Sequence, residues 1–329
     1  MAYAAWNFNT IQLGREVTAG TAVAATEKWR GEFSMLVDNQ AIETVEEQVG
    51  LYISPERTYT AWESAELQIP STPLTYEQVP HVFEAGLLTV TPTGAGPYTY
   101  DYVVPVLTRP AIQPYTIEGG NADIQGDNQE MPYSFVTSFR LSGTIKQSWM
   151  MESTWMGQRL VPSTLTPALP LLDVEQALFG NTQLFIDPSG GTIGTTQLNG
   201  VLMQAEINCT NTGIQEVPTA DGTNYYSQHK LVGPEMDFSL TFELEDTANA
   251  VDTARAAYRA QTPQLIQLLV PGTGGRSIRM RMTGRYTDFP SYTNDNGNTS
   301  VQIGGTVSYN STDNLFFECQ VINNRANLD

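Results

Sequence analysis

The chain has 329 residues, and its 16 lysines and arginines against 35 aspartates and glutamates give a formal net charge of −19. This length allows two domains of ordinary size, each with its own core. The acidic balance argues against a surface that grasps nucleic acid, because such surfaces gather basic residues to displace counterions.

The two cysteines, Cys209 and Cys319, are too few for a disulfide framework or a cysteine zinc site, so the sequence favours a reducing compartment. The segment from Met1 to Asn7 lacks the basic and apolar regions of a signal peptide, and no later run approaches a membrane span. We therefore expect a soluble protein that has no membrane span and is not exported by a cleaved signal.

The opening of the chain is polar up to about Thr26. A first strand is predicted where Phe33, Met35 and Val37 alternate. The segment Asp38 to Arg57 is acidic and has no sustained period, which indicates a long loop or an extended hairpin.

A strand and a helix follow this segment. Ala65, Leu67 and Ile69 alternate with polar residues, the pattern of a strand with one wet face. Thr75 and Gln78 have the spacing of a capping box. Since a proline inside a helix removes a hydrogen bond, Pro80 predicts a short or kinked helix. One helical face would carry Val79, Phe83 and Leu87, with Gly86 closing the helix.

The rest of the first half is predicted as strands and loops. Thr91 to Pro97 is a turn that would join hairpin strands Leu87 to Val90 and Tyr98 to Val104. Gly119 to Pro132 is predicted as a second acidic loop, and strands from Phe135 to Trp149 finish this half.

A proline-rich stretch, Leu160 to Asp173, suits an extended linker. After it, Asp187 to Gly191 is a turn and Leu202 to Thr210 a strand. Asn211 to Gly233 is a long polar loop at the place that the acidic segment holds upstream. We expect both long segments to be mobile in the free protein and to become ordered in an assembly.

The second half then repeats the plan of strand, helix and strand. Phe238 to Leu244 alternates as a strand, and Asp246 offers an N-cap. Thr262-Pro263 would end the helix, and Gln264 to Val270 returns to extended structure. The helical spacing is carried by Ala250, Val251, Ala254, Ala257 and Tyr258. Further strands are predicted over Ile278 to Met282, Thr299 to Tyr309 and Leu315 to Ile322, with an Asn296-Gly297 hairpin turn.

Three weak matches recur in the same order in both halves. They are the strand and helix units just described, the run from Asn9 to Thr26 with that from Asn181 to Thr196, and Phe139 to Ile145 with Val301 to Val307. They predict a mainly β chain of two duplicated antiparallel β-sandwich or barrel domains, each with one flanking helix and a long loop. The predicted boundaries are 1–165 and 175–329, with a proline-rich linker over 166–174.

No catalytic, cofactor or metal site is predicted, so we do not expect an enzyme. His81 and His229 have no serine or cysteine signature beside them and are interpreted as surface or interface histidines. The run from Asp295 to Asn298 lacks the spaced carboxylates of a calcium loop. Gly272 to Arg276 lacks the lysine and following helix of a phosphate cradle.

Arg279 and Arg281 point to one face of a predicted strand, while Ile278, Met280 and Met282 point to the other. This basic stripe is either a solvated face or a surface that meets the carboxylates of a neighbouring subunit.

Short pieces along nearly the whole chain are similar to one family. The pieces are Gly20-Thr21, Leu67 to Ile69, Leu74 to Glu77, Leu141 to Thr144, the proline-rich linker, Thr182 to Asp187, Gly191-Thr192, Leu240 to Glu243 and Tyr258 to Pro263. In these pieces the chain resembles the major tail tube proteins of long-tailed (siphovirus-like) bacteriophages, of the fused two-domain type.

The resemblance implies a structural virion protein whose small β-sandwich domains form rings that stack into a hollow tube. Three two-domain chains would make a pseudo-hexameric ring, assembled in the bacterial host cytoplasm and located in the virion tail. Its partners would be further copies, the tape measure protein, and the tail terminator and tip proteins. DNA would pass through an acidic lumen without specific binding. Contacts between rings or subunits are expected at Glu43, Glu46, Glu47, Arg57, Asn224, Tyr225, Arg279 and Arg281.

The rival interpretation is a tandem β-sandwich surface protein that binds carbohydrate or another ligand. Such a protein would be expected to carry a signal peptide and an exposed aromatic platform. The tryptophans are instead scattered, at Trp6, Trp29, Trp62, Trp149 and Trp155.

Overall fold

The structure is a computed structural model that describes residues 5–53, 56–244, 250–295 and 297–328. Strands hold 51% of the chain and helices 8%, in large antiparallel sheets, so the prediction of a mainly β fold is confirmed. The first half contains β1 (Asn9–Arg15), β2 (Glu27–Lys28), β3 (Val37–Glu46), β4 (Glu56–Pro73), α1 (Val79–Gly86), β5 (Tyr98–Val103), β6 (Tyr115–Asn121), β7 (Ile124–Thr144), β8 (Met150–Gly157) and β9 (Val161–Pro162).

The second half begins with β10 (Gln183–Pro188), β11 (Gln197–Leu198) and β12 (Leu202–Asn211), and short 3₁₀ turns precede both β1 and β10. The remaining elements are β13 (Ile214–Val217), β14 (Gln228–Leu231), β15 (Glu235–Glu243), α2 (Ala250–Ala260), β16 (Gln264–Pro271), β17 (Ser277–Asp288), β18 (Thr293–Asp295), β19 (Asn298–Val307) and β20 (Phe317–Asn323).

Both halves have the same order of paired strands. In the first half the neighbours run β2-β1-β6-β7-β8-β4-β3. In the second half they run β11-β10-β16-β17-β19-β15-β12. All of these pairs are antiparallel. The helix also has the same place in the chain order of each half, since α1 follows β4 and α2 follows β15.

This correspondence agrees with two of the three sequence matches. Asn9 to Leu13 and Asn181 to Leu184 lie around β1 and β10, and the strand and helix units lie at β4-α1 and β15-α2. The third match is wrong in register, because it sets β7 against β19, whose counterpart in the pairing order is β8. Repeated dipeptides in strands are weak evidence, since alternating sequences resemble one another.

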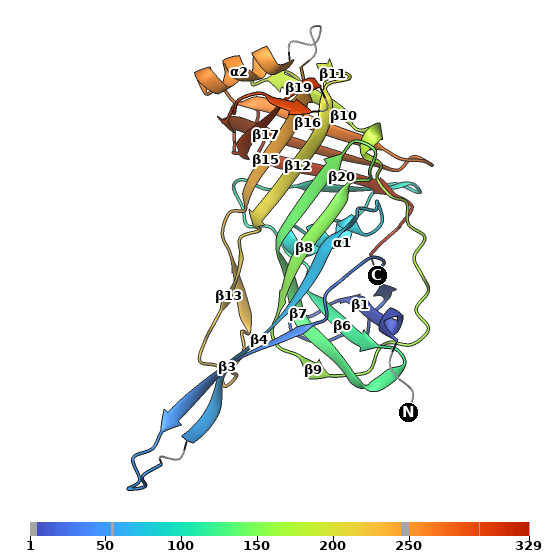
Figure 1. The fold of residues 1–329 in the computed structure, drawn as a ribbon. Helices are drawn as coiled ribbons and strands as arrows, with labels where there is room; N and C mark the ends of the chain where they lie inside the picture. Colours follow the sequence, from blue (N-terminus) through green and yellow to red (C-terminus); the bar gives the residue numbers. More distant parts are fainter. Residues whose placement is uncertain (1–4, 54–55, 245–249, 296, 329) are drawn as a thin grey trace.

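The two halves are joined through backbone pairing. β12 pairs with β7, and β20 pairs with β5 of the first half. A single large hydrophobic cluster contains residues of both halves, such as Trp155 and Phe242. Figure 1 shows the second half with α2 at one end of the molecule and the first half at the other.

The opening of the chain differs from the prediction. The polar stretch before Thr26 contains β1, where Ile11 and Leu13 are buried. The strand predicted from Phe33 begins only at Val37. Phe33 and Met35 lie outside it: Phe33 packs against the core, and Met35 lies at the surface. The acidic segment that follows is a hairpin of β3 and β4, which was one of the two predicted alternatives.

The first helix is buried on all sides. Every residue from Val79 to Gly86 is buried, so the helix has no single apolar face. Pro80 lies in its first turn, where an N–H would have no helical partner, and the helix is short, with 8 residues, which was one of the two predicted alternatives. The Thr75 hydroxyl accepts the Gln78 N–H at 3.3 Å, but the predicted capping box is wrong, because the helix begins only at Val79 and its N-cap residue is Gln78, which makes no side-chain cap hydrogen bond.

One loop and one strand predicted in the first half are wrong. Gly119 to Pro132 is a hairpin of β6 and β7 rather than an acidic loop, and Glu118 and Glu130 lie opposite each other in it. Leu87 to Val90 is not a strand, and β5 instead pairs with β20. Long-range pairing of this kind leaves no local signal in a sequence.

The predicted core of the second half is confirmed. Phe238, Leu240 and Phe242 are buried along β15, as is Met236 before them, whereas Leu244 of the predicted strand lies beyond its end and is 42% exposed. The buried residues of α2 are Ala250, Val251, Ala254 and Ala257, and β16 follows as expected. The predicted N-cap Asp246 and Asn296 of the hairpin turn lie outside the described residues; β18 and β19 pair on either side of the latter.

Candidate assembly surface

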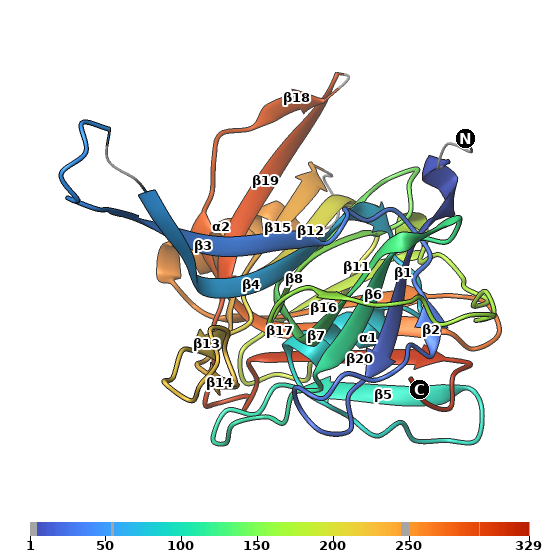
Figure 2. The ribbon, with the colours of Figure 1, turned by 90° about the horizontal axis from the view of Figure 1, so that it is seen from below.

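The hairpin of β3 and β4 projects from the body of the molecule as an arm (Figure 2). We define the arm as residues 37–63. Its ladder runs from Val37 opposite Glu66 to Glu46 opposite Glu56. All of β3 except Val45 is exposed, whereas β4 enters the core only from Ala65 onward. At the base of the arm, Trp62 packs against a small hydrophobic cluster of the body. Beyond the base, the exposed ladder has no packed face and would be marginally stable alone, so it presents its side chains to a partner or to water.

The arm carries apolar side chains at its tip. Tyr52 is fully exposed, and Ile53 is 80% exposed. Apolar groups gathered at an exposed site are typical of interaction surfaces. The other exposed apolar residues of the arm are Val37, Ile42, Val49, Leu51 and Tyr59.

Four of the predicted contact residues lie on this arm. Glu43, Glu46, Glu47 and Arg57 all belong to the hairpin or its tip. Arg57 and Glu47 form an ion pair of 3.3 Å. The prediction did not include the apolar tip, although the run Val49 to Ile53 within an acidic segment signals it in the sequence.

The corresponding segment of the second half, 212–234, folds back instead of projecting. It forms the small hairpin of β13 and β14, which packs against the first half of the same chain. Tyr226 is fully buried, and its hydroxyl donates a hydrogen bond to the Tyr133 carbonyl. His229 lies 2.9 Å from the Tyr133 hydroxyl. The prediction of a long polar loop here is wrong, because the segment forms a hairpin whose partners belong to the first half of the same chain.

Two further predicted contact residues lie in this hairpin's loop. Asn224 is bonded twice to Glu63 of the arm's base, through its carbonyl at 2.7 Å and its side-chain amide at 2.9 Å. The Arg159 guanidinium lies over the Tyr225 ring at 4.4 Å. The two hydrogen bonds of Asn224 with Glu63 hold the base of the arm against the second-half hairpin.

The predicted basic stripe lies on β17, with the two arginines on one face and Ile278, Met280 and Met282 buried on the other. Arg279 and Arg281 each lie 3.4 Å from Glu318 of β20. Arg281 also donates to Gln267 at 2.7 Å. Burial and the neighbouring Arg279 lower the pKa of Arg281. The stripe is thus paired with carboxylate and amide groups of its own sheet.

A buried polar cluster lies beside α1 and includes His81, which was predicted to be a surface or interface histidine. His81 is 1% exposed, 3.1 Å from Glu27 and 2.9 Å from Arg325. Arg325 and Glu27 form a very short ion pair. Burial lowers the pKa of His81. Burial opposes ionisation of Glu27, but the hydrogen bonds and charges of His81 and Arg325 lower its pKa overall.

The same cluster continues to the other side of α1. Tyr115 lies 3.0 Å from the second ring nitrogen of His81, and its hydroxyl donates to Glu84 at 3.2 Å. Arg15 of β1 lies 3.1 Å from Glu84. Because each charge here has a partner of opposite sign, the cluster holds α1, β1 and residue 325 together rather than exposing a reactive group.

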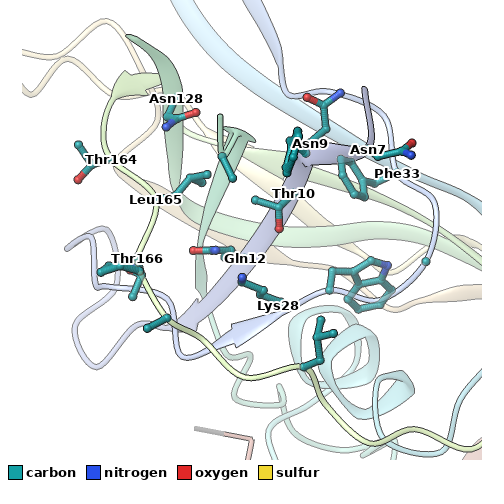
Figure 3. A pocket seen from close by; sticks show the side chains of 17 residues that line it. Asn7, Asn9, Thr10, Gln12, Lys28, Phe33, Asn128, Thr164, Leu165 and Thr166 are labelled. Atoms are coloured by element: carbon teal, nitrogen blue, oxygen red, sulfur yellow. The ribbon is translucent and has the colours of Figure 1, made fainter. Parts of the chain in front are cut away.

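A groove of about 510 Å³ lies where the linker crosses β1 (Figure 3). Its walls come from β1, from Asn128 on β7 and from linker residues 164–168. Lys28 is the one charged residue among those that line it. With a single charge and mostly amide, hydroxyl and apolar neighbours, the groove has no converging acid and base.

No group of histidine, cysteine or acidic residues in the described part of the chain could hold a metal ion. Neither described helix has the length and apolar character to cross a membrane. No family model matches the chain, and no curated protein matches it.

Proposed function

We propose that this chain is a tail tube protein, which polymerises into stacked rings around a channel for DNA. The observation that carries the proposal is the strand order found twice in one chain. A chain with two equivalent halves supplies two neighbouring positions in a ring. The resemblance in sequence to two-domain tail tube proteins supports the same function.

A ring of this kind has three chains and six similar positions. Each chain would contact the next through different surfaces on its two sides, a heterologous contact that closes when the rotation allows. The arm supports the stacking of rings, since it reaches beyond the body and carries exposed apolar residues. The tape measure, terminator and tip proteins would be the other partners in the tail.

The charge of the chain suits such a channel. A formal net charge of −19 repels DNA phosphates, so DNA would slide past a wall of like sign without binding to it. Assembly would take place in the bacterial cytoplasm, where the two buried cysteines would remain reduced.

Electron microscopy of the concentrated purified protein tests this function. We expect hollow tubes of uniform diameter, and three chains per ring in a cryo-EM reconstruction or in native mass spectra of single rings. Six chains per ring would contradict the equivalence of the two halves. A monodisperse monomer at all concentrations, with no tubes or rings, would contradict the proposed function itself.

A further inference from the structure

The two halves of the chain meet edge to edge. Six residues of β12 pair with β7, from Gln204 opposite Thr144 to Cys209 opposite Phe139. Arg140 donates two hydrogen bonds, of 2.8 and 2.7 Å, to Glu206 across this contact. The internal junction is therefore a continuous antiparallel ladder between an edge strand of one half and a long strand of the other.

The strand that corresponds to β12 in the first half is β3, and its outer edge is open. Among the described strands, β3 pairs with β4 alone. Just before it, Ser34 donates its N–H to Gln68 of β4 at 2.7 Å. If the ladder of β3 continued back to Phe33, the backbone groups of Phe33 and Met35 would face away from β4, because successive groups of a strand point to opposite sides.

The neighbouring ladders align this edge with β12. In the first half, the ladder of β4 with β8 begins with the pair Ala65 and Gly157. Ala65 also pairs with Asp38 of β3. In the second half, the ladder of β15 with β19 begins with the pair Asp237 and Thr306. Met236, the residue before it, pairs with Cys209 of β12. Asp38 thus corresponds to Cys209, and the six residues of β12 in the internal junction correspond to Phe33–Asp38, which we call the front edge.

The partner of β12 has a counterpart as well. The ladder of β7 with β6 ends at Ser134. The corresponding ladder of β17 with β16 ends at Gly284. Phe139 follows Ser134 by five residues, and Phe289 follows Gly284 by the same number. The six residues of β7 in the junction therefore correspond to Phe289–Asn294, which we call the rear edge. In the described chain, the only ladder of the rear edge is that of β18 with β19.

The two edges match in chemistry. The register of the internal junction sets Met35 opposite Tyr292, and these side chains are 38% and 44% exposed. Aromatic and apolar residues opposite each other stabilise a ladder. Acidic Glu32 and Asp38 are exposed just before and at the end of the front edge, and basic Arg259 and Arg285 are exposed near the rear edge, where Asp288 is exposed as well.

We propose that the front edge of one copy pairs with the rear edge of the next, so that the internal junction is repeated between chains. Since it supplies the contact between neighbours in a ring, this pairing rests on the proposed function. The partner is a second copy of this chain, bound through an antiparallel ladder that continues the sheet. Because the two edges belong to different halves, the contact is heterologous and passes from copy to copy.

Cysteine crosslinking of full-length chains tests the pairing. Met35→Cys and Tyr292→Cys are made in separate chains, mixed under assembly conditions and oxidised mildly. A disulfide forms only when the two Cα atoms lie about 4.4–6.8 Å apart. We expect a crosslinked dimer in the mixture, little in either variant alone, and a ladder of oligomers from the double variant. Ser291→Cys or Thr293→Cys, used in place of Tyr292→Cys, would crosslink to Met35→Cys if the register were shifted by one residue.

The native thiols do not compete, because both are buried and burial raises the pKa of Cys209 to about 12. Leu107→Cys, at a position 93% exposed and outside both edges, is the control partner for Tyr292→Cys and should stay uncrosslinked.

The outcomes separate the pairing from the tube function. Tubes whose chains show no crosslink at the three tested positions, or Met35→Cys pairing with itself, would overturn the edge contact and leave the function standing. Crosslinked chains that never form tubes would support the edge contact and overturn the function. Neither tubes nor crosslinks would overturn both.

Discussion

Tyr226 and Tyr133 lie in different halves of the chain, and the hydroxyl of the first donates to the backbone carbonyl of the second. Their rings stack with centroids 5.4 Å apart. Tyr133 has a φ of 54°, which is unusual for a residue other than glycine, and Glu16 accepts its N–H at 2.7 Å. The second-half hairpin therefore closes over a specialised backbone site of the first half.

Tyr226→Phe should lower the free energy of unfolding by about 1–3 kcal/mol, because it removes a donor from the buried carbonyl of Tyr133. Urea denaturation followed by fluorescence measures the change. Tyr309→Phe, which removes a hydroxyl from a ring that is 46% exposed, is the matched control and should change stability by less than about 0.5 kcal/mol. Equal effects of the two substitutions would show that the second-half hairpin is not docked in the free protein.

Arg276 is expected to be a strong link between the halves. It donates to Glu77 of the first half at 2.6 Å and lies 3.2 Å from Glu175 at the end of the linker. Arg276→Ala leaves the 1% exposed Glu77 without this charge, so we expect a loss of about 3 kcal/mol in unfolding free energy. Arg140→Ala breaks the more exposed pair with Glu206 and should cost at most about 1 kcal/mol. The opposite ranking in thermal denaturation would contradict the assignment.

The buried cluster around His81 predicts acid sensitivity. Because the folded state holds the pKa of His81 below 6.5, the unfolded state binds more protons as the pH falls below that value, and stability declines. The lowered pKa of Glu27 also makes the folded protein less stable as the pH falls. This loss of stability occurs at lower pH, where the carboxylate of Glu27 becomes protonated.

His81→Gln cannot take up this proton, so its stability should depend less on pH between 7 and 5, even if it is lower at pH 7. The expected difference in slope is at most about 1.4 kcal/mol per pH unit. Urea titrations at each pH measure it, and because both proteins retain His229, the difference isolates His81. Identical slopes would show that His81 does not titrate in this range.

Removing the arm should leave a folded protein that does not form tubes. Ile42 lies opposite Thr60, so replacing Glu43 through Tyr59 by an Asn-Gly turn closes the ladder without altering the core. Sedimentation and electron microscopy measure assembly, and the unfolding transition should keep its midpoint within a few degrees. Tubes that form normally from this variant would exclude the arm as the stacking element.

A milder variant separates apolar from acidic contributions. Replacing Leu51, Tyr52 and Ile53 by serine removes the exposed apolar tip and retains the carboxylates of the arm. We expect assembly to weaken at least tenfold in critical concentration. Replacing Glu43 and Glu46 by glutamine, as the matched control, should change mainly the salt dependence of assembly.

The sequence predicted what local periodicity can show. The alternation in β4, β15 and β17 and the spacing in α2 each reported a buried face, and the structure confirms them. Pro80 predicted a short α1, which the structure confirms, whereas the capping box predicted at Thr75 lies before the helix begins at Val79. The acidic composition led to the wrong prediction of a loop at the β6-β7 hairpin. Acidic residues are usually exposed, but Glu118 of β6 is buried and accepts hydrogen bonds from Thr166 and Ala25.

The candidate surface was predictable only in part. The acidic arm residues stood out by charge, whereas docking of the second hairpin depends on contacts such as Asn224 with Glu63, which are 161 residues apart. The pairing of β5 with β20 has no local signature for the same reason. Residues far apart in the chain carry no periodicity in common, so such contacts become visible only in three dimensions.

The pairing of β5 with β20 also sets an order of events during synthesis. Asp101 and its partner Gln320 are separated by 219 residues, and Asn323 and Arg325 complete the surroundings of α1 through Tyr76 and Glu27. A ribosome must therefore make nearly all of the second half before the first half can complete its own core. Chains released early would lack both the final strand and the cluster that locks α1, so incomplete copies would be poor candidates for incorporation into a growing polymer.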